Sequence, residues 1–469
     1  MNNKMKHITI FMASLCMLFL AIGCDSKVKK QPASVISDAQ VEDIVRRSYQ
    51  YVALYNVNNK FALTQGGWNT VVADTRLKDH TMRDIARPNN DTLYIAALID
   101  LRTEPFILDI PAFNSTYVSL MVTAYDHYVS IPMSTRQGDF EKPEKVLFYT
   151  ARTEGYSGES VEGVDRIIEE SGDFISAVFR VMPHTNEPER FEQIKQQMQS
   201  VGLKTLSEYQ GKPAKPVDPV AFPDTGATDA DIFGTNLLEV MQFVFNHVTF
   251  DPTNDLDQAL LAAYEPLGVI PGKVFDPSLA VSFDGDRFRA AAEKVAVKKL
   301  ALLQDSDKFA RHAPLQFQPK GSTELDTLVA VSVIGPIGMP MEEAMYPAIV
   351  TTDGKAMNAL NDYVIRMSAD DMPPANAFWS TTLYDTENGF FIPNDLKKYS
   401  VGENAGMKLN AEGGIEIYVA AEKPDGVPEE NWLPINRKDE NLDILLRIYA
   451  PDREKMKTWT APKAEKVGM

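Results

Sequence analysis

Three oxygen-bearing side chains, Asn89, Asn90 and Asp91, stand together in the stretch ARPNNDTLY, and Tyr94 follows them. Amide and carboxylate oxygens at a loop-to-strand junction can accept hydrogen bonds from backbone N–H groups and stabilise a turn. The same oxygens can bind a hard cation or the hydroxyls of a sugar. Asn89, Asp91 and Tyr94 are therefore candidate ligand-binding residues. Asp91 is also a candidate catalytic carboxylate, and turn stabilisation is the alternative.

A carboxylate and an imidazole are adjacent in the stretch AYDHYVS, where Asp126 precedes His127. An acid–base pair of this kind could move protons, with Tyr125 and Tyr128 as the walls of a site. Adjacent residues of a strand point to opposite faces, so the two side chains would not pair directly if the segment is a strand. Asp126 and His127 are candidate catalytic residues, and a structural role at a strand end is the alternative.

Aromatic and hydroxyl side chains gather in PPANAFWSTTLYD, which contributes Trp379, Ser380 and Tyr384. Such a set could stack on a carbohydrate or an apolar small molecule, although aromatic residues usually belong to a core. Further along, Arg447 alternates with apolar residues in LLRIYAP and could bind an anion or pair with a carboxylate. Trp379, Ser380 and Tyr384 complete the candidate ligand-binding set.

Several common chemistries leave motifs that this chain lacks. It has no HExxH, no GxSxG and no GxGxxG, and its six histidines are far apart in sequence. The missing motifs argue against nucleotide binding, Rossmann cofactors and zinc hydrolysis. We expect no cofactor and no metal. An enzyme remains an alternative, because active sites assemble from distant residues.

The first residues have the pattern of a secretory leader. Lys4 and Lys6 precede an apolar stretch, which ends at Gly23 and is short for a membrane span. AIGC resembles a bacterial lipobox, which predicts a signal peptide over 1–23 and a diacylglyceryl group on Cys24. Ala21 departs from the usual leucine, and an ordinary secretory signal is the alternative.

Lipidation would place the protein in the bacterial cell envelope as a membrane-anchored lipoprotein outside the cytoplasm, facing the periplasm in a Gram-negative cell. Residues 24–36 would form a flexible tether. The mature chain would contain no free thiol, since Cys16 would leave with the leader and the sulfur of Cys24 would carry the lipid.

The formal net charge of −18 argues against nucleic acid as a partner, because nucleic-acid binding needs a basic surface. With 44% hydrophobic residues, the chain has ample material for a core of two or three domains.

The periodicity of apolar residues predicts the order β, α, β. A helix begins at Ser37 and continues to near Tyr55. Alternating strand segments follow, then helical spacing, and then strands again. We expect an N-terminal β domain with a leading helix, a mostly helical middle region and a C-terminal β domain, over 37–155, 156–310 and 311–469. Strands are predicted in TLYIAALIDL, PFILDIP, TYVSLMV, NDYVIRMSA, NAFWSTTLYD, GIEIYVAAE and LDILLRIYA, and helices in PERFEQIKQQMQSVG, in NLLEVMQFVFNHV and from Asp286 to near Leu303.

Several of these stretches carry a family resemblance. RPNNDTLYIAALIDLRTEPFILDIP resembles the signature of domain-of-unknown-function family 1254. Four later stretches resemble family 1214 and occur in the order that this family shows: PPANAFWSTTLYD, GFFIPNDLKKYS, ENWLPI and LLRIYAP. The resemblance extends from near Gln40 to Trp459 and implies a mainly β fold with helical insertions. It implies two jelly-roll β-sandwich domains, similar to those of double-jelly-roll capsid proteins.

The resemblance supplies no reaction and no catalytic roles, so the matching residues form either a site or an interface between the β domains. They are Asn89, Asp91, Thr92, Tyr94, Asp100, Trp379, Ser380, Tyr384, Asn394, Trp432, Arg447 and Tyr449.

Taken together, these features favour an envelope lipoprotein that binds a small molecule or a glycan between two β domains. The alternatives are a cofactor-independent hydrolase or lyase, and an assembly protein that forms a homo-oligomer. A binding role predicts a concave pocket lined by some of Trp379, Tyr384, Tyr94 and Asn89.

Overall fold

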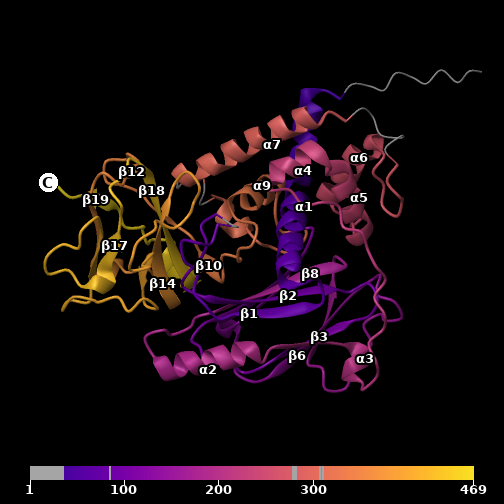
Figure 1. Cartoon of the computed structure of the whole chain (residues 1–469), viewed down its shortest axis with the longest axis horizontal. Coiled ribbons are helices and arrows are strands. Elements are labelled where there is room, and N and C mark those ends of the chain that lie inside the picture. The colour runs from indigo at the N-terminus through magenta and orange to yellow at the C-terminus, as the bar shows by residue number, and fades with distance from the viewer. Residues whose placement is uncertain (1–35, 84–85, 277–282, 306–307, 309–310, 469) are drawn as a thin grey trace, which may run out of the picture. The chain divides into compact units, whose positions relative to one another are not determined.

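A long helix, α1 (Asp38–Gln65), opens the part of the chain that the structure describes. The computed structural model describes residues 36–83, 86–276, 283–305, 308 and 311–468, so the predictions for the leader and for Cys24 lie outside it (Figure 1). Ser37 caps the helix in a capping box with Gln40, as its position predicts. The helix continues past Tyr55 until Gly66, whose φ of 91° allows a left-handed cap.

The first sheet is antiparallel and has the strand order β1-β2-β8-β4-β5. Side chains alternate between its faces. Leu93 and Phe179 point into a core shared with a second sheet, whereas their neighbours Tyr94 and Arg180 belong to the opposite face. The strands are β1 (Thr70–Asp74), β2 (Leu93–Asp100), β4 (Val118–Ala124), β5 (Val129–Ser134) and β8 (Phe174–Val181).

The second sheet has the order β7-β6-β3-β9, and Ile194 and Met198 of helix α2 join its core. Because β8 is hydrogen-bonded between β2 and β4, the first β region continues beyond residue 155, where the sequence predicts a boundary. The elements are β3 (Phe106–Ile110), η1 (Thr135–Gln137), β6 (Glu144–Thr150), β7 (Arg166–Glu170), α2 (Pro188–Gln199), β9 (Gly202–Thr205) and α3 (Leu206–Tyr209).

Helices of the middle region pack around α1 and share one core with it (Figure 1). Val329 of α9 belongs to this core, so α9 joins the helices although the sequence assigns its residues to the C-terminal domain. The helices are α4 (Asp229–Thr235), α5 (Leu237–His247), α6 (Asp255–Tyr264), η2 (Glu265–Leu267), α7 (Gly285–Leu300), η3 (Ala301–Gln304), η4 (Ala313–Leu315) and α9 (Leu325–Ile334).

The C-terminal β region contains two more sheets, around β18 and β13, which enclose a common core that includes Trp379. The first has the order β10-β18-β14-β15, with β11 and β12 also on β18, and the second has the order β17-β16-β13-β19. The elements are β10 (Ala344–Met345), β11 (Ala348–Ile349), β12 (Met357–Asn358), β13 (Tyr363–Met367), η5 (Ala369–Asp371), β14 (Ala375–Asp385), β15 (Ser400–Gly402), β16 (Ile415–Ala420), η6 (Glu429–Asn431), β17 (Trp432–Pro434), β18 (Asn441–Pro451), α10 (Arg453–Met456) and β19 (Ala464–Lys466).

The fold is therefore mixed, with largely antiparallel open sheets and helices between the two β regions. The strand predictions are confirmed as β2, β3, β4, β13, β14, β16 and β18, and the helix predictions as α2, α5 and α7. Among the described residues, no helix combines the length and the apolar character needed to cross a membrane.

Candidate ligand-binding site

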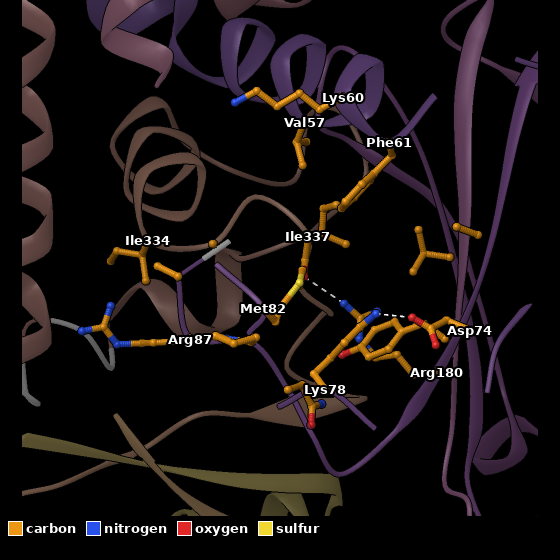
Figure 2. Close-up of a pocket in the computed structure, with 18 of the residues that line it drawn as sticks. Val57, Lys60, Phe61, Asp74, Lys78, Met82, Arg87, Arg180, Ile334 and Ile337 are labelled. Atoms are coloured by element: carbon orange, nitrogen blue, oxygen red, sulfur yellow. Dashed lines mark hydrogen bonds and ion pairs between the residues drawn. The ribbon is translucent and has the colours of Figure 1, made fainter. Parts of the chain in front are cut away.

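A cavity of about 820 Å³ lies where α1, the open face of the first sheet, α9 and β18 meet. Val57 and Phe61 of α1 line one side, and Tyr94 and Arg180 of the sheet line another. Figure 2 shows Arg180 reaching into this space beneath α1. Both the size and the mixture of apolar walls with a few polar groups are typical of small-molecule sites.

Strand register explains how the sheet provides its wall. Asp74 pairs with Tyr94, and Tyr94 pairs with Arg180, so the three lie in one row across β1, β2 and β8. Neighbouring strands are about 4.8 Å apart, which places the backbone of Asp74 about 10 Å from that of Arg180. Asp74 forms an ion pair with Lys78 instead. The acid in the row of Arg180 is thus two strands away from it and already paired with a lysine.

Arg180 is 4% exposed, and its guanidinium is only partly bonded. Its Nη2 donates to the carbonyl oxygen of Ile337 at 2.8 Å, and its carbon Cζ lies 5.7 Å from the ring centroid of Tyr94. Its Nη1 has no hydrogen-bond partner within the described part of the chain, and no described carboxylate lies within 4.0 Å of it. A buried cation with an unused donor is costly unless something else binds it.

The guanidinium keeps its charge despite this burial. Arginine stays protonated in proteins at neutral pH. Burial favours the neutral form, but Coulombic interaction with Tyr94 and with nearby tyrosines, Tyr346 among them, raises the pKa of Arg180. Tyr94 and Tyr346 also line the cavity, and no hydrogen bond of either hydroxyl is found among the described residues. The polar end of the cavity therefore combines one cation with two phenol groups that can donate hydrogen bonds.

The charge of the cavity wall is opposite to that of the whole protein. Six cationic side chains and a single carboxylate occur among its described lining residues, whereas the chain has a net charge of −18. A positive, partly desolvated concavity attracts small anions. The charged lining residues are Lys60, Lys78, Arg83, Arg87, Arg180, Arg447 and Asp74.

Arg447 also lines the cavity, but its hydrogen bonds are made within the protein. It donates to Tyr384 Oη at 2.7 Å, to Thr382 Oγ1 at 2.8 Å and to the backbone oxygen of Arg87 at 3.1 Å. Asp91 lies behind it and accepts a hydrogen bond from Ser380. Burial raises the pKa of Asp91, and the charge of Arg447 opposes that rise. Arg447 therefore holds the two β regions together, whereas Arg180 has an Nη1 group without a described hydrogen-bond partner.

The loop after α9 forms another wall and is fixed at two points. His127 Nε2 donates to the carbonyl oxygen of Pro336 at 2.7 Å, and Arg180 binds that of the next residue, Ile337. Gly338 packs against the ring of Phe317, which a Cβ atom at position 338 would approach to 2.0 Å. These contacts determine how close the loop comes to Arg180.

The candidate residues from the sequence fall into three places. Asn89 and Tyr94 line the cavity. Asp91, Ser380 and Tyr384 are buried behind it around Arg447. Trp379 is part of the C-terminal core and is absent from the lining residues.

Asp126 and His127 lie in the turn between β4 and β5, and their side chains have different partners. Lys320 Nζ is 3.5 Å from an oxygen of Asp126, whereas His127 contacts Pro336. Burial lowers the pKa of His127 to about 4, so the imidazole is neutral at pH 7. The structure does not bring this carboxylate and this imidazole together.

Sequence reasoning missed Arg180, the residue at the centre of the cavity. A signal was present, because FISAVFRV in β8 has one charged residue in an otherwise strand-forming run. A buried strand with a lone arginine needs a partner for that charge. The partner cannot be identified from sequence, since the surrounding residues, among them Tyr94, Ile337 and Tyr346, come from distant segments.

Comparison with known proteins relates both β regions to families. A model described as Protein of unknown function (DUF1254) matches residues 68–202, and one described as Protein of unknown function (DUF1214) matches residues 342–453. The first match includes Tyr94 and Arg180, and the second includes Tyr346 and Arg447. The cavity is thus lined from both regions.

Among solved structures, five chains match. One is the crystal structure of the VPA0106 protein from Vibrio parahaemolyticus, at 23% identity with a TM-score of 0.66, covering 91% of this chain and all of that one. Another, a putative uncharacterized protein from Burkholderia cenocepacia, is 13% identical with a TM-score of 0.42, over 92% of this chain and 96% of its own. The first of these supports the fold. The search of curated proteins returned no match.

Proposed function

We propose that this chain, whose two β regions match the DUF1254 and DUF1214 family models, binds a small organic anion in the cavity between those regions, with Arg180 as the anchor. The observation that carries the proposal is the unused Nη1 of a buried, charged guanidinium. A carboxylate, phosphate or sulfonate supplies both the missing acceptor and the missing negative charge.

The surroundings of Arg180 favour an anion over a neutral ligand. Tyr94 and Tyr346 offer hydrogen-bond donors beside it, and the nearest acid in its row, Asp74, is already paired with Lys78. By contrast, Arg87 forms a bidentate pair with Asp443 at 3.1 and 3.2 Å and needs no ligand. Lys60 and Arg83 are the more exposed cations of the wall, so the buried charge that remains to be neutralised is that of Arg180.

Two fluorescent probes test this proposal, since they share an apolar body and differ in charge. They are 8-anilinonaphthalene-1-sulfonate, which is anionic, and N-phenyl-1-naphthylamine, which is neutral. We expect Arg180→Met to weaken binding of the sulfonate about 10- to 100-fold, the range of a hydrogen bond to a charged group, and to leave the neutral probe within about twofold. Arg366→Met, which changes an exposed arginine of β13, is the control. Equal losses for both probes, or no loss for either, would refute the proposal.

We also propose that the mature chain is a membrane-anchored envelope lipoprotein, which the leader and Cys24 support. Cys24→Ser should release the protein from the membrane fraction and abolish the acyl mass on the N-terminal peptide. A Cys24→Ser protein that stays with the membrane would argue against the anchor.

Two finer points complete the proposal. The arrangement of each β region in two sheets supports jelly-roll sandwiches like those of capsid proteins. Homo-oligomerisation is tested by light scattering after size exclusion, in which a monomer mass would exclude it.

A further inference from the structure

The cavity changes in character with distance from Arg180. Val57 and Phe61 of α1 are one helical turn apart and face it together, and the lining residues of α9 are all apolar: Ala330, Val331 and Ile334. Figure 2 shows Val57 and Phe61 on the α1 side of this space and Ile337 between them and Arg180. A passage along α1 and α9 therefore continues from the charged end. Its α9 side is apolar, and its α1 side combines Val57 and Phe61 with the polar Lys60, Thr64 and Gln65.

The passage ends at an apolar lip on the surface. Leu63 of α1 is 75% exposed and Val72 of β1 is 41% exposed, and both line the cavity. Leu63 is six residues beyond Val57, which corresponds to about 9 Å along the helix axis. Large aliphatic side chains at a cavity mouth leave apolar surface that an equally apolar ligand would cover.

We propose that the ligand is a single-chain amphiphile, in which a carboxylate or phosphate head binds Arg180 and an unbranched alkyl chain passes between α1 and α9 to the lip at Leu63 and Val72. This inference rests on the proposed function and narrows its ligand class. A glycan fits less well, because α9 would leave its hydroxyls without hydrogen-bond partners, and each buried unpaired hydroxyl is unfavourable.

The test is a chain-length series measured by isothermal titration calorimetry. Alkyl carboxylates of six, eight, ten and twelve carbons are compared below their micellar concentrations with alkyl phosphates and alkanols of the same lengths. We expect the dissociation constant to fall about fourfold for each added methylene until the chain reaches the lip. Carboxylate or phosphate binding should exceed alkanol binding about 10- to 100-fold, and the stronger of the two anions identifies the head group.

The path of the chain is tested at the lip. Leu63→Ser should weaken binding of the twelve-carbon anion several-fold and leave the six-carbon anion unchanged. Val297→Ser, a change at a 69% exposed residue of α7 that does not line the cavity, is the matched control. Both variants alter exposed residues, and circular dichroism verifies that they fold.

Two outcomes separate this inference from the proposed function. If Arg180→Met removes the preference for the anionic probe but chain length has no effect on affinity, the anion site stands and the amphiphile inference is overturned. If the chain-length increments persist equally in Leu63→Ser, the proposed path is wrong. If Arg180→Met binds the anionic probe as tightly as the wild type, both proposals are overturned.

Discussion

Replacing Arg447 with methionine should destabilise the protein strongly, although methionine retains an unbranched apolar stem. In the native structure Arg447 makes three hydrogen bonds and its charge offsets that of the buried Asp91. Arg447→Met removes these bonds and leaves Asp91 as a buried carboxylate without that cation. Arg447 and Asp91 do not form an ion pair within 4.0 Å, so the three hydrogen bonds carry most of the effect. A hydrogen bond from a charged group contributes about 1.5–3 kcal/mol, and we expect a loss of about 3–5 kcal/mol of unfolding free energy at pH 7.

The destabilisation should depend on pH with a defined sign. Asp91 already has a pKa raised by burial, and loss of the Arg447 charge raises the pKa further. A carboxyl whose pKa is higher in the folded than in the unfolded state favours folding below its unfolded pKa, and this contribution is lost as pH rises through the folded pKa. The defect of Arg447→Met should therefore be smaller at about pH 5 than at about pH 8.

Urea denaturation followed by tryptophan fluorescence measures both effects. The double variant Asp91→Asn/Arg447→Met should recover more than about 1 kcal/mol relative to Arg447→Met, because the uncompensated charge is gone. Arg180→Met is the matched control, since that buried arginine donates one hydrogen bond among the described residues where Arg447 donates three. A loss below about 1 kcal/mol for Arg447→Met, or no recovery in the double variant, would refute this account of the Asp91–Arg447 interaction.

Three further changes test other parts of the structure. Gly338→Ala should displace the Phe317 ring, destabilise the protein by about 1–3 kcal/mol in thermal or urea unfolding and weaken probe binding, and unchanged binding would show that this contact does not shape the cavity. Lys320 Nζ donates to Asp257 at 2.8 Å and lies 3.5 Å from Asp126, so Lys320→Met should cost about 3–5 kcal/mol at pH 7, and a neutral effect in urea unfolding would contradict this ion-pair cluster. Burial raises the pKa of Glu170 to about 7 from 4.5, so its contribution to stability is present below pH 4.5 and is lost as pH rises through 7. Glu170→Gln should remove roughly 2–3 kcal/mol of this decline between pH 5 and pH 8, and identical pH profiles for variant and wild type would disprove the shift.

Local sequence patterns predicted most of the elements that build the fold. The alternation in β2, β4 and β18 and the helical spacing in α5 and α7 follow from side-chain geometry within a few residues. The start of α1 was readable for the same reason, because the capping box of Ser37 is a local device. Its end was not, since the apolar pattern weakens near Tyr55 while packing against other helices continues to stabilise the helix.

The sequence by itself determined which segments are strands and helices, the acidic balance of the chain and its resemblance to two families. It also singled out three residues of the cavity wall, Asn89, Tyr94 and Arg447. Only the tertiary structure decided that Arg180 lines a cavity and has a donor without a described partner, whereas Arg447 donates its hydrogen bonds to groups of the protein itself. Both arginines look alike in sequence, each set in a strand of apolar residues. Their difference arises from partners far away along the chain, and the energy of a buried charge depends on those partners and not on its sequence neighbours.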